Sequence, residues 1–430
     1  MLIEFEVANF LSFHNPVRLS MVAAAPIKER QEENVFDAGR RRLLKSAAIY
    51  GANASGKSNL LSAFSFMRWL ALNSSKETQA EEHIRVKPFK LDVKTGTQPS
   101  RFEVVFSLGN GVRYRYGFEA DATRITAEWL FLAKVRAETT LFVRDENGIQ
   151  LGAKFTEGRD LEEKTRANSL FLSVVAQFNG PVATRVLNWF RSARPLHAGV
   201  PNGRHVGRSI EMLQEGDQHK KLLAFLRHAD LCIEDLEATE REANIPPPSF
   251  MTEEGKQELK KKVAMLKWVS LSSMHGVYDH GKRVSQTSLD FESAESDGTQ
   301  KFFHLAGPIL DALENGSILL VDELEAGLHP LLTRAIVRLF NSSESNPKNA
   351  QLIFTTHDTN LLSDAGLRRD QIWFVEKDRA EATDLYSLAE FKLPKGGKVR
   401  NDAAIGKNYI QGRYGAVPLL GDFATLGRGN

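Results

Sequence analysis

The chain has 430 residues, of which 42% are hydrophobic and 26% are charged, and its 56 basic residues nearly balance its 54 acidic residues. These ordinary values exclude a disordered or fibrous chain, and a formal net charge of +2 gives no overall attraction to nucleic acid or membranes. The single cysteine, Cys232, excludes an intrachain disulfide and a cysteine-based zinc cluster, which fits a reducing cytoplasm. Glu4 and Glu6 interrupt the first apolar stretch, and no apolar run approaches the ~20 residues that cross a bilayer. We therefore expect a cytoplasmic protein without a membrane span.

The first 80 residues have the pattern of a strand, a second strand, a loop and a helix. Apolar and acidic residues alternate near the N-terminus, within residues 1–13, which predicts a half-buried strand. The apolar run 47–50 leads directly into a glycine-containing loop, and apolar residues then recur at helical spacing over 57–72. Residues 1–80 are thus expected to form the N-terminal part of an α/β domain.

Residues 81–155 have the alternation that is typical of antiparallel strands. Aromatic and apolar residues alternate over 102–118 around an Asn110-Gly111 turn signal, which predicts a hairpin. Two more strand-like runs follow at 129–135 and 140–144. We expect an antiparallel β subdomain here.

The remaining chain divides into three segments. Residues 156–290 are expected to form a mostly helical insertion, because apolar residues there recur at helical spacing. Residues 291–392 show a helix (299–314), then strand, helix, strand and strand, a pattern that predicts a parallel sheet. Residues 393–430 are expected to form a basic C-terminal tail.

Residues 51–58 read Gly-Ala-Asn-Ala-Ser-Gly-Lys-Ser, which matches the phosphate-binding loop pattern G-x-x-x-x-G-K-[ST]. The loop lies between a predicted strand and a predicted helix, where backbone N–H groups and the helix N-terminus bind phosphates. Lys57 can reach the β- and γ-phosphates of ATP, and Ser58 can bind Mg²⁺. The residues expected to bind nucleotide in this segment are Gly51, Ala52, Asn53, Ala54, Ser55, Gly56, Lys57, Ser58 and Asn59.

A second motif places two acids directly after a buried strand. The apolar residues 318–321 are followed by Asp322 and Glu323. We expect Asp322 to help bind Mg²⁺ and Glu323 to act as the catalytic base that polarises water. Because 265 residues separate Lys57 from Asp322, a large insertion lies between the two motifs.

Two further segments accompany these acids. The polar loop at 295–300 opens a predicted helix, so it is either an ordinary helix cap or a second helix N-terminus that binds an anion. His357 ends a predicted strand, 35 residues beyond Asp322. Ligands bind at the carboxyl ends of strands in α/β sheets, so we expect His357 to act as a catalytic residue that senses the γ-phosphate.

The ordered motifs GANASGKS, ESDGTQ, ILLVDE, GLHP and TTHD resemble the ABC-type ATPase head of the SMC and OLD proteins. The resemblance implies an α/β P-loop ATPase head, interrupted by the antiparallel β subdomain and the mostly helical insertion. It also implies composite sites, in which a signature loop of one protomer covers the ATP bound by another. The residues that correspond to the signature are Ser296, Asp297, Gly298 and Thr299, with Asp297 in place of a small residue. Gln177 is the candidate for the metal-binding glutamine, and an ordinary helix residue is the alternative.

Both ends of the chain, EVANFLSF and the later YIQGRYGAVP, resemble stand-alone OLD-like AAA ATPases of bacterial anti-phage loci, such as the abortive-infection L-type and PARIS-type ATPases. This resemblance implies a defence ATPase that uses ATP and Mg²⁺, forms at least a homodimer, and controls a separate effector encoded nearby. A TOPRIM-type nuclease is one candidate effector. The chain itself has no Asp-x-Asp motif and is expected to have no nuclease activity.

Two other functions compete with this one. A RecF-like or SMC-like DNA-repair ATPase would bind DNA directly, and the basic segments 40–45 and 392–413 are candidate DNA contacts; a solvated tail or a surface for an acidic partner explains them equally. The ATP subunit of a transporter is disfavoured by the long insertion between Lys57 and Asp322.

Overall fold

The computed structural model describes residues 1–77, 79–109, 111–134, 137–197, 203–229, 231–242, 267–393, 397–400 and 403–418. The chain forms two compact units. The larger unit comprises Met1–Gly199, Ala312–Ala326 and Pro330–Asn430, and the smaller unit comprises Val200–Asp311 and Gly327–His329. No helix among these described residues combines the length and the apolar character needed to cross a membrane.

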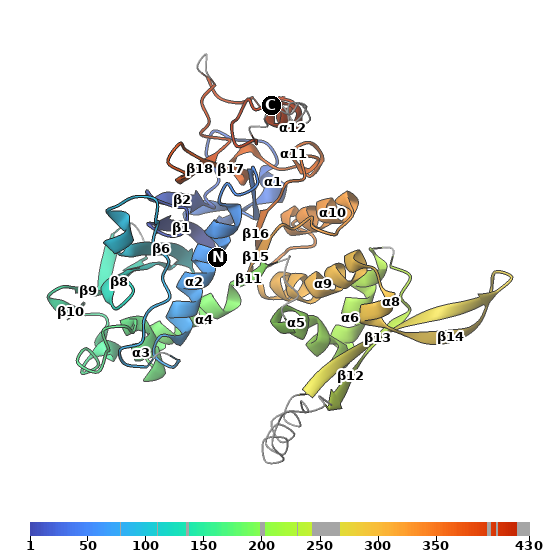
Figure 1. The fold of residues 1–430 in the computed structure, drawn as a ribbon, viewed down its shortest axis with the longest axis horizontal. Helices are drawn as coiled ribbons and strands as arrows, with labels where there is room; N and C mark the ends of the chain where they lie inside the picture. Colours follow the sequence, from blue (N-terminus) through green and yellow to red (C-terminus); the bar gives the residue numbers. More distant parts are fainter. Residues whose placement is uncertain are drawn as a thin grey trace, which may run out of the picture. The chain divides into compact units, whose positions relative to one another are not determined.

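The larger unit contains a seven-stranded antiparallel sheet, drawn in blue to green in Figure 1. Its order is β10-β9-β8-β7-β6-β1-β2, so the expected antiparallel sheet is confirmed. Two strands from the N-terminal segment complete this sheet, so residues 81–155 do not form a sheet of their own. Asn110, at the expected turn, lies outside the described residues. The strands are β1 (Leu2–Ala8), β2 (Val17–Ser20), β6 (Ser100–Ser107), β7 (Arg113–Ala120), β8 (Ile125–Ala133), β9 (Glu138–Asp145) and β10 (Gly148–Leu151).

A second, six-stranded sheet of the larger unit has the order β11-β15-β16-β5-β17-β18. All neighbours pair in parallel except β17 and β18, which confirms the predicted parallel sheet. The four-residue β11 was not predicted, because a strand so short gives little periodic signal inside a segment read as helical. The strands are β5 (Ser46–Gly51), β11 (Arg194–His197), β15 (Ile318–Asp322), β16 (Gln351–Thr355), β17 (Ile372–Lys377) and β18 (Thr383–Ser387).

Helix α2 (Lys57–Asn73) packs against β1 of the first sheet and against β5 and β15 of the second. Its predicted apolar face is buried as expected, and Phe64 contacts the rings of Phe5 and Trp189 at centroid distances of 5.3 and 6.3 Å. The larger unit also contains α1 (Gln31–Asn34), β3 (Val35–Ala38), β4 (Arg41–Leu44), η1 (Thr95–Thr97), η2 (Thr156–Gly158), α3 (Phe171–Gln177), α4 (Pro181–Ser192), α10 (Pro330–Asn341), α11 (Leu361–Asp364), η3 (Arg369–Gln371) and α12 (Ile405–Ile410).

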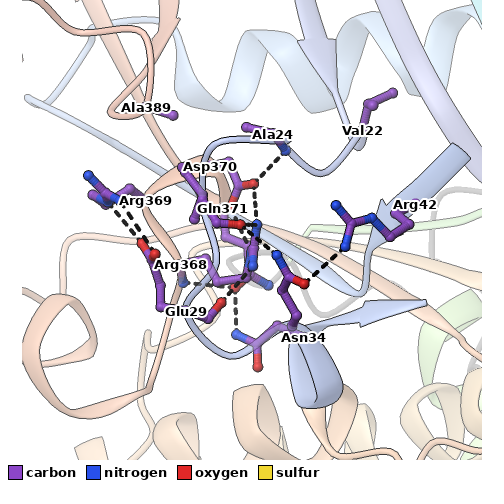
Figure 2. Close-up of polar contacts among 12 residues, drawn as sticks. Val22, Ala24, Glu29, Asn34, Arg42, Arg368, Arg369, Asp370, Gln371 and Ala389 are labelled. Carbon is purple, nitrogen blue, oxygen red and sulfur yellow. Dashed lines mark hydrogen bonds and ion pairs between the residues drawn. The ribbon is translucent and has the colours of Figure 1, made fainter. Parts of the chain in front are cut away.

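A buried polar cluster fastens the N-terminal segment to the amino ends of β5 and β17 (Figure 2). The guanidinium of Arg368, which is 1% exposed, donates to both carboxylate oxygens of Asp370 at 2.9 and 2.7 Å and to the carbonyl of Glu29 at 2.6 Å. Gln371 joins the same cluster, accepting from Asn34 Nδ2 at 2.6 Å. These bonds fix the edge of the sheet opposite to the phosphate loop.

The smaller unit combines helices with a three-stranded sheet of order β12-β13-β14. The helical expectation for residues 156–290 holds for α3 to α6 but not for residues 235–242 and 267–290, which contain three strands, and residues 243–266 of this segment lie outside the described residues. The elements are α5 (Gly203–Gln214), α6 (Gly216–Arg227), β12 (Asp235–Glu242), β13 (Lys267–Asp279), β14 (Lys282–Asp290) and α8 (Phe291–Ala294), followed by α9 (Asp297–Asn315), which ends in the larger unit.

The described part of the C-terminal tail packs its tyrosines against the parallel sheet, while its basic side chains Lys398, Lys407 and Arg413 are exposed. Tyr409 and Tyr414 are buried and stack on Phe374 of β17 at centroid distances of 5.3 and 6.0 Å. Tyr409 also contacts Tyr50, the penultimate residue of β5, at 5.7 Å. The tail therefore supports the strand that precedes the phosphate loop. Lys395, which belongs to the basic segment 392–413, lies outside the described residues.

Candidate functional site

The phosphate loop connects β5 to α2, and its two glycines are required by the geometry. Gly56 has φ +111°, and a Cβ there would lie 2.5 Å from Thr383 Oγ1 and 2.9 Å from Ser12 Oγ. A Cβ on Gly51 would lie 2.4 Å from the carbonyl oxygen of Val375. Only glycine fits these two positions, so the loop can curl into a cradle for phosphates.

Residues distant in sequence hold this loop from behind. The Thr383 hydroxyl lies 2.9 Å from the carbonyl oxygen of Ser55 and 2.7 Å from Ser12 Oγ, and Asn59 Nδ2 donates to Ser12 Oγ at 2.7 Å. Ser55 Oγ itself is buried without a hydrogen-bond partner among the described residues. Asn59 of α2 and Thr383 of β18 thus anchor the loop. The hydroxyl of Ser55, within the loop, has no partner in the described part of the chain.

Lys57 begins α2 with its ammonium turned back into the loop. The side chain is 5% exposed, and Nζ donates to the carbonyl oxygens of Gly51 at 3.0 Å and Ala52 at 2.9 Å. Burial lowers the pKa of Lys57, while the nearby carboxylates of Glu323 and Asp322 act in the opposite direction. A partly desolvated cation held only by neutral carbonyls is suited to bind a phosphate.

The acids at the end of β15 lie beside the phosphate loop, as the sequence predicts. Ser58 Oγ donates to Asp322 Oδ1 at 3.1 Å. Thr355 Oγ1, at the end of the neighbouring strand β16, donates to the same oxygen at 2.6 Å and accepts the backbone N–H of Glu323 at 2.7 Å. Glu323 has φ +50°, a left-handed conformation that is unusual for a residue with a side chain. The chain thus turns sharply where the expected base follows Asp322.

His357 follows β16 at the same edge of the sheet. Its backbone N–H donates to Glu325 Oε1 at 2.6 Å, and Glu325 Oε2 is buried without a hydrogen-bond partner among the described residues. Burial lowers the pKa of His357 and the charge of Lys57 lowers it further, whereas Glu325 and the other carboxylates act to raise it. The imidazole therefore favours its neutral form more than an ordinary histidine does.

The residues present fit a Mg²⁺ ion that is shared with a nucleotide. Ser58 and Asp322 supply hydroxyl and carboxylate oxygens, which are the ligands that Mg²⁺ prefers. Within the described parts of the chain, no group of three or more histidine, cysteine, aspartate or glutamate side chains could hold a metal ion. Few protein ligands are expected where phosphate oxygens and water complete the coordination of Mg²⁺.

The expected signature residues lie in the smaller unit, at the start of α9. Ser296 Oγ accepts the backbone N–H of Thr299 at 3.2 Å and lies 2.9 Å from Thr299 Oγ1, so Ser296 caps the helix. A Cβ on Gly298 would lie 2.7 Å from the carbonyl oxygen of Gly327. Asp297 is exposed in the first turn. The helix-cap interpretation is therefore correct, and it leaves a role in binding phosphate open.

Gln177 does not belong to the site. It is the exposed last residue of α3, and α3 is tied to the far end of α2, where Ser75 and Ser173 hydrogen-bond at 2.8 Å between their hydroxyls. The 17 residues of α2 span roughly 25 Å, so Gln177 lies far from the phosphate loop at the other end. Asp322 lies between β16 and β11, and the last residue of β11, His197, pairs in register with Asp322.

Sequence reasoning missed four residues that shape this edge: Ser12, Glu325, Thr355 and Thr383. Ser12 lies in the N-terminal motif EVANFLSF, and Thr355 lies in TTHD, but nothing in those motifs showed which side chains they would contact. Glu325 belongs to the loop after the expected base, without a predicted role. Thr383 had no signal in the sequence.

Comparisons with known proteins place these motifs in a family. The family model described as "AAA domain, putative AbiEii toxin, Type IV TA system" matches residues 46–363. No curated protein matches the chain. Among solved structures, the SMC head domain from Thermotoga maritima is similar at 14% identity and a TM-score of 0.38, covering 90% of this chain and 98% of its own. The recombination mediator protein RecF of the RecFOR pathway, in complex with ATPrS, is similar at 13% identity and a TM-score of 0.34, covering 90% and 98%.

Proposed function

The chain belongs to the AAA-domain family whose model matches its residues 46–363, and from this premise we propose that it binds ATP with Mg²⁺ and hydrolyses it. One observation carries the proposal. The carboxyl ends of the neighbouring strands β5, β16 and β15 bring the phosphate loop, His357 and the acids Asp322 and Glu323 to one edge of the parallel sheet. This is the edge at which α/β sheets bind ligands.

Each residue of the site has a role that follows from its position. Lys57 exchanges its two carbonyl partners for phosphate oxygens, and the backbone N–H groups of the loop bind the remaining phosphate charge. Ser58 and Asp322 would hold Mg²⁺, which neutralises charge on the phosphates when it is bound. Glu323 orients water and accepts its proton, while the neutral imidazole of His357 contacts the γ-phosphate.

A pair of variants tests this function. Lys57→Ala should abolish tight binding of a fluorescent ATP analogue, because no other residue of the loop brings a flexible cation to the phosphates. Glu323→Gln should bind the analogue normally but hydrolyse ATP at least tenfold more slowly, because an amide cannot accept a proton. Equal hydrolysis by the wild type and Glu323→Gln would contradict the assignment of the base, and a wild type that binds no ATP would contradict the function.

We further propose that the active form is a homo-oligomer, at least a dimer, with composite nucleotide sites. The family resemblance of Ser296, Asp297, Gly298 and Thr299 supports this arrangement, together with their position at a helix N-terminus, which favours anions. In this arrangement, the phosphate loop of one protomer and the signature loop of another bind the same ATP. The hydrolysis rate per protomer should then rise with protein concentration. A rate per protomer that stays constant over a wide dilution range, in a strictly monomeric sample, would exclude composite sites.

We also propose that the ATPase controls a separate effector in anti-phage defence, and that it does not cleave nucleic acid itself. The basic side chains of Lys392, Lys398, Lys407 and Arg413 support a contact with an acidic partner, since all four are exposed. Such a contact should weaken as salt rises. Replacing Lys392 and Lys398 with Glu should reduce capture of the effector encoded beside this chain. Unchanged capture would exclude this surface, and DNA binding that is lost in the same variant would favour the DNA-repair function instead.

A further inference from the structure

The Thr355 hydroxyl connects Asp322, the expected Mg²⁺ ligand, to Glu323, the expected catalytic base. Thr355 is the last residue of β16 and is completely buried. Its Oγ1 donates to Asp322 Oδ1 at 2.6 Å and accepts the backbone N–H of Glu323 at 2.7 Å. Because a hydroxyl has one proton, the N–H of Glu323 fills its acceptor side and directs that proton to Asp322.

One of these hydrogen bonds orients the carboxylate of Asp322, and the other holds the left-handed backbone of Glu323. Asp322 Oδ1 also accepts from Ser58 Oγ at 3.1 Å, so Thr355 sets the orientation of the carboxylate that faces the phosphate loop. The backbone of Glu323 is in the left-handed region at φ +50°, which persists only where surrounding contacts hold it. The backbone bond from Leu324 N to Thr355 O, at 3.1 Å, fastens the next residue of the same turn.

We propose that Thr355 is a positioning residue for the ATPase reaction, which aligns Asp322 for Mg²⁺ and the Glu323 backbone for proton transfer through one hydroxyl group. This inference rests on the proposed ATPase function. Thr355 contacts neither nucleotide nor water in this role, and it acts only through the two acids. The hydroxyl is required, whereas the γ-methyl group is not.

Isosteric and conservative variants separate this role from simple packing. Thr355→Val keeps the shape but removes both hydrogen bonds, whereas Thr355→Ser keeps the hydroxyl. We expect Thr355→Val to lower kcat for ATP by at least tenfold and Thr355→Ser to remain within about threefold of the wild type. Thr333→Val is the matched control, because Thr333 is also a buried threonine of the larger unit but its hydroxyl has no partner among the described residues.

The effect of Mg²⁺ on nucleotide affinity is a second measurement, which a purely structural role of Thr355 would not change. Affinity for a fluorescent ATP analogue is measured with excess EDTA and again with Mg²⁺. Thr355→Val should match the wild type in EDTA but lose most of the affinity gain that Mg²⁺ gives the wild type, and Thr355→Ser should retain that gain. Thr333→Val should retain it as well.

Three results would overturn the inference while leaving the ATPase function intact. These are an active wild type with an equally active Thr355→Val, an unchanged gain from Mg²⁺ in that variant, or an equal loss in Thr355→Val and Thr355→Ser. A wild type without ATP hydrolysis would instead contradict the proposed function itself. If Thr355→Val does not fold, as judged by its melting temperature and circular dichroism, the comparison of Thr355→Ser with Thr355→Ala decides the role of the hydroxyl in the same way.

Discussion

The carboxylate of Glu325 accepts the backbone N–H of His357 at 2.6 Å, so the loop after the expected base also fixes the loop that carries the expected phosphate sensor. The two residues are 32 positions apart and come from the ends of neighbouring parallel strands, β15 and β16. Glu325 contacts a backbone group here, so its expected effect on ATP hydrolysis is through the position of His357.

This relationship predicts different results for two substitutions of Glu325. Glu325→Gln keeps an oxygen that can accept the His357 N–H, so hydrolysis should stay within about threefold of the wild type. Glu325→Ala removes the acceptor and should lower kcat by roughly tenfold or more, because His357 loses its fixed position. Steady-state ATP hydrolysis checks both. An equal loss in the two variants would mean that the negative charge matters and the acceptor does not.

The pKa of His357 gives a second prediction, because substitutions of Lys57 and of Glu325 should shift this pKa in opposite directions. Burial and the charge of Lys57 lower this pKa from the ordinary histidine value, so the ligand-free imidazole should gain its proton at a lower pH than an exposed histidine does. Lys57→Ala should raise this pKa, because a nearby positive charge is removed. Glu325→Gln should lower it, because a nearby negative charge is removed. NMR titration of labelled histidines checks both shifts, with the His357 signal assigned by its loss in His357→Asn; a shift of the opposite sign in either variant would contradict the arrangement.

The buried pair of Arg368 and Asp370 predicts a large effect on stability. The carboxylate of Asp370 is 5% exposed, and it accepts hydrogen bonds from Arg368 and from the backbone N–H of Ala24. Arg368→Met would remove the charged partner and keep the backbone N–H. Breaking one side of a buried ion pair costs about 3–5 kcal/mol, so the unfolding midpoint in urea should fall clearly. Arg18→Met is the control, because Arg18 is 56% exposed and its pair with Glu6 should contribute about 0–1 kcal/mol. Equal effects of the two substitutions would contradict this account.

Ser296 tests the composite site while separating it from the helix cap. Ser296→Asn keeps a side chain that caps helices well but replaces the hydroxyl that the proposed composite site presents to the nucleotide, so it should preserve stability and lower hydrolysis. Ser296→Arg should leave ATP binding to the phosphate loop nearly unchanged but block hydrolysis, because a bulky side chain would prevent the approach of the second protomer. Mixing Ser296→Arg with Lys57→Ala should restore part of the activity, because each mixed dimer has one intact composite site. Hydrolysis by Ser296→Arg alone at the wild-type rate would contradict the prediction.

The elements that a local pattern specifies were predictable. Residues 46–73 form the expected strand, phosphate loop and helix, and α10 (Pro330–Asn341) is the helix expected between two strands of the parallel sheet. These predictions succeeded because glycine positions, helical spacing and strand alternation are imposed on neighbouring residues by backbone sterics. Gln177 was misassigned because a helix residue carries no local sign of which end of another helix it will approach.

The sequence by itself determined the phosphate loop and the two acids after a buried strand, since the chemical groups of each motif are adjacent in the chain. The tertiary structure alone decided that Thr355 joins Asp322 to Glu323, that Glu325 holds the backbone of His357, and that the packed tail supports Tyr50. All of these contacts join residues more than 30 positions apart, and those of Thr355 and Glu325 form only when parallel strands align their carboxyl ends at one edge. Strand order and register set these distances, and both depend on the packing of the whole unit around α2 rather than on any short run of residues.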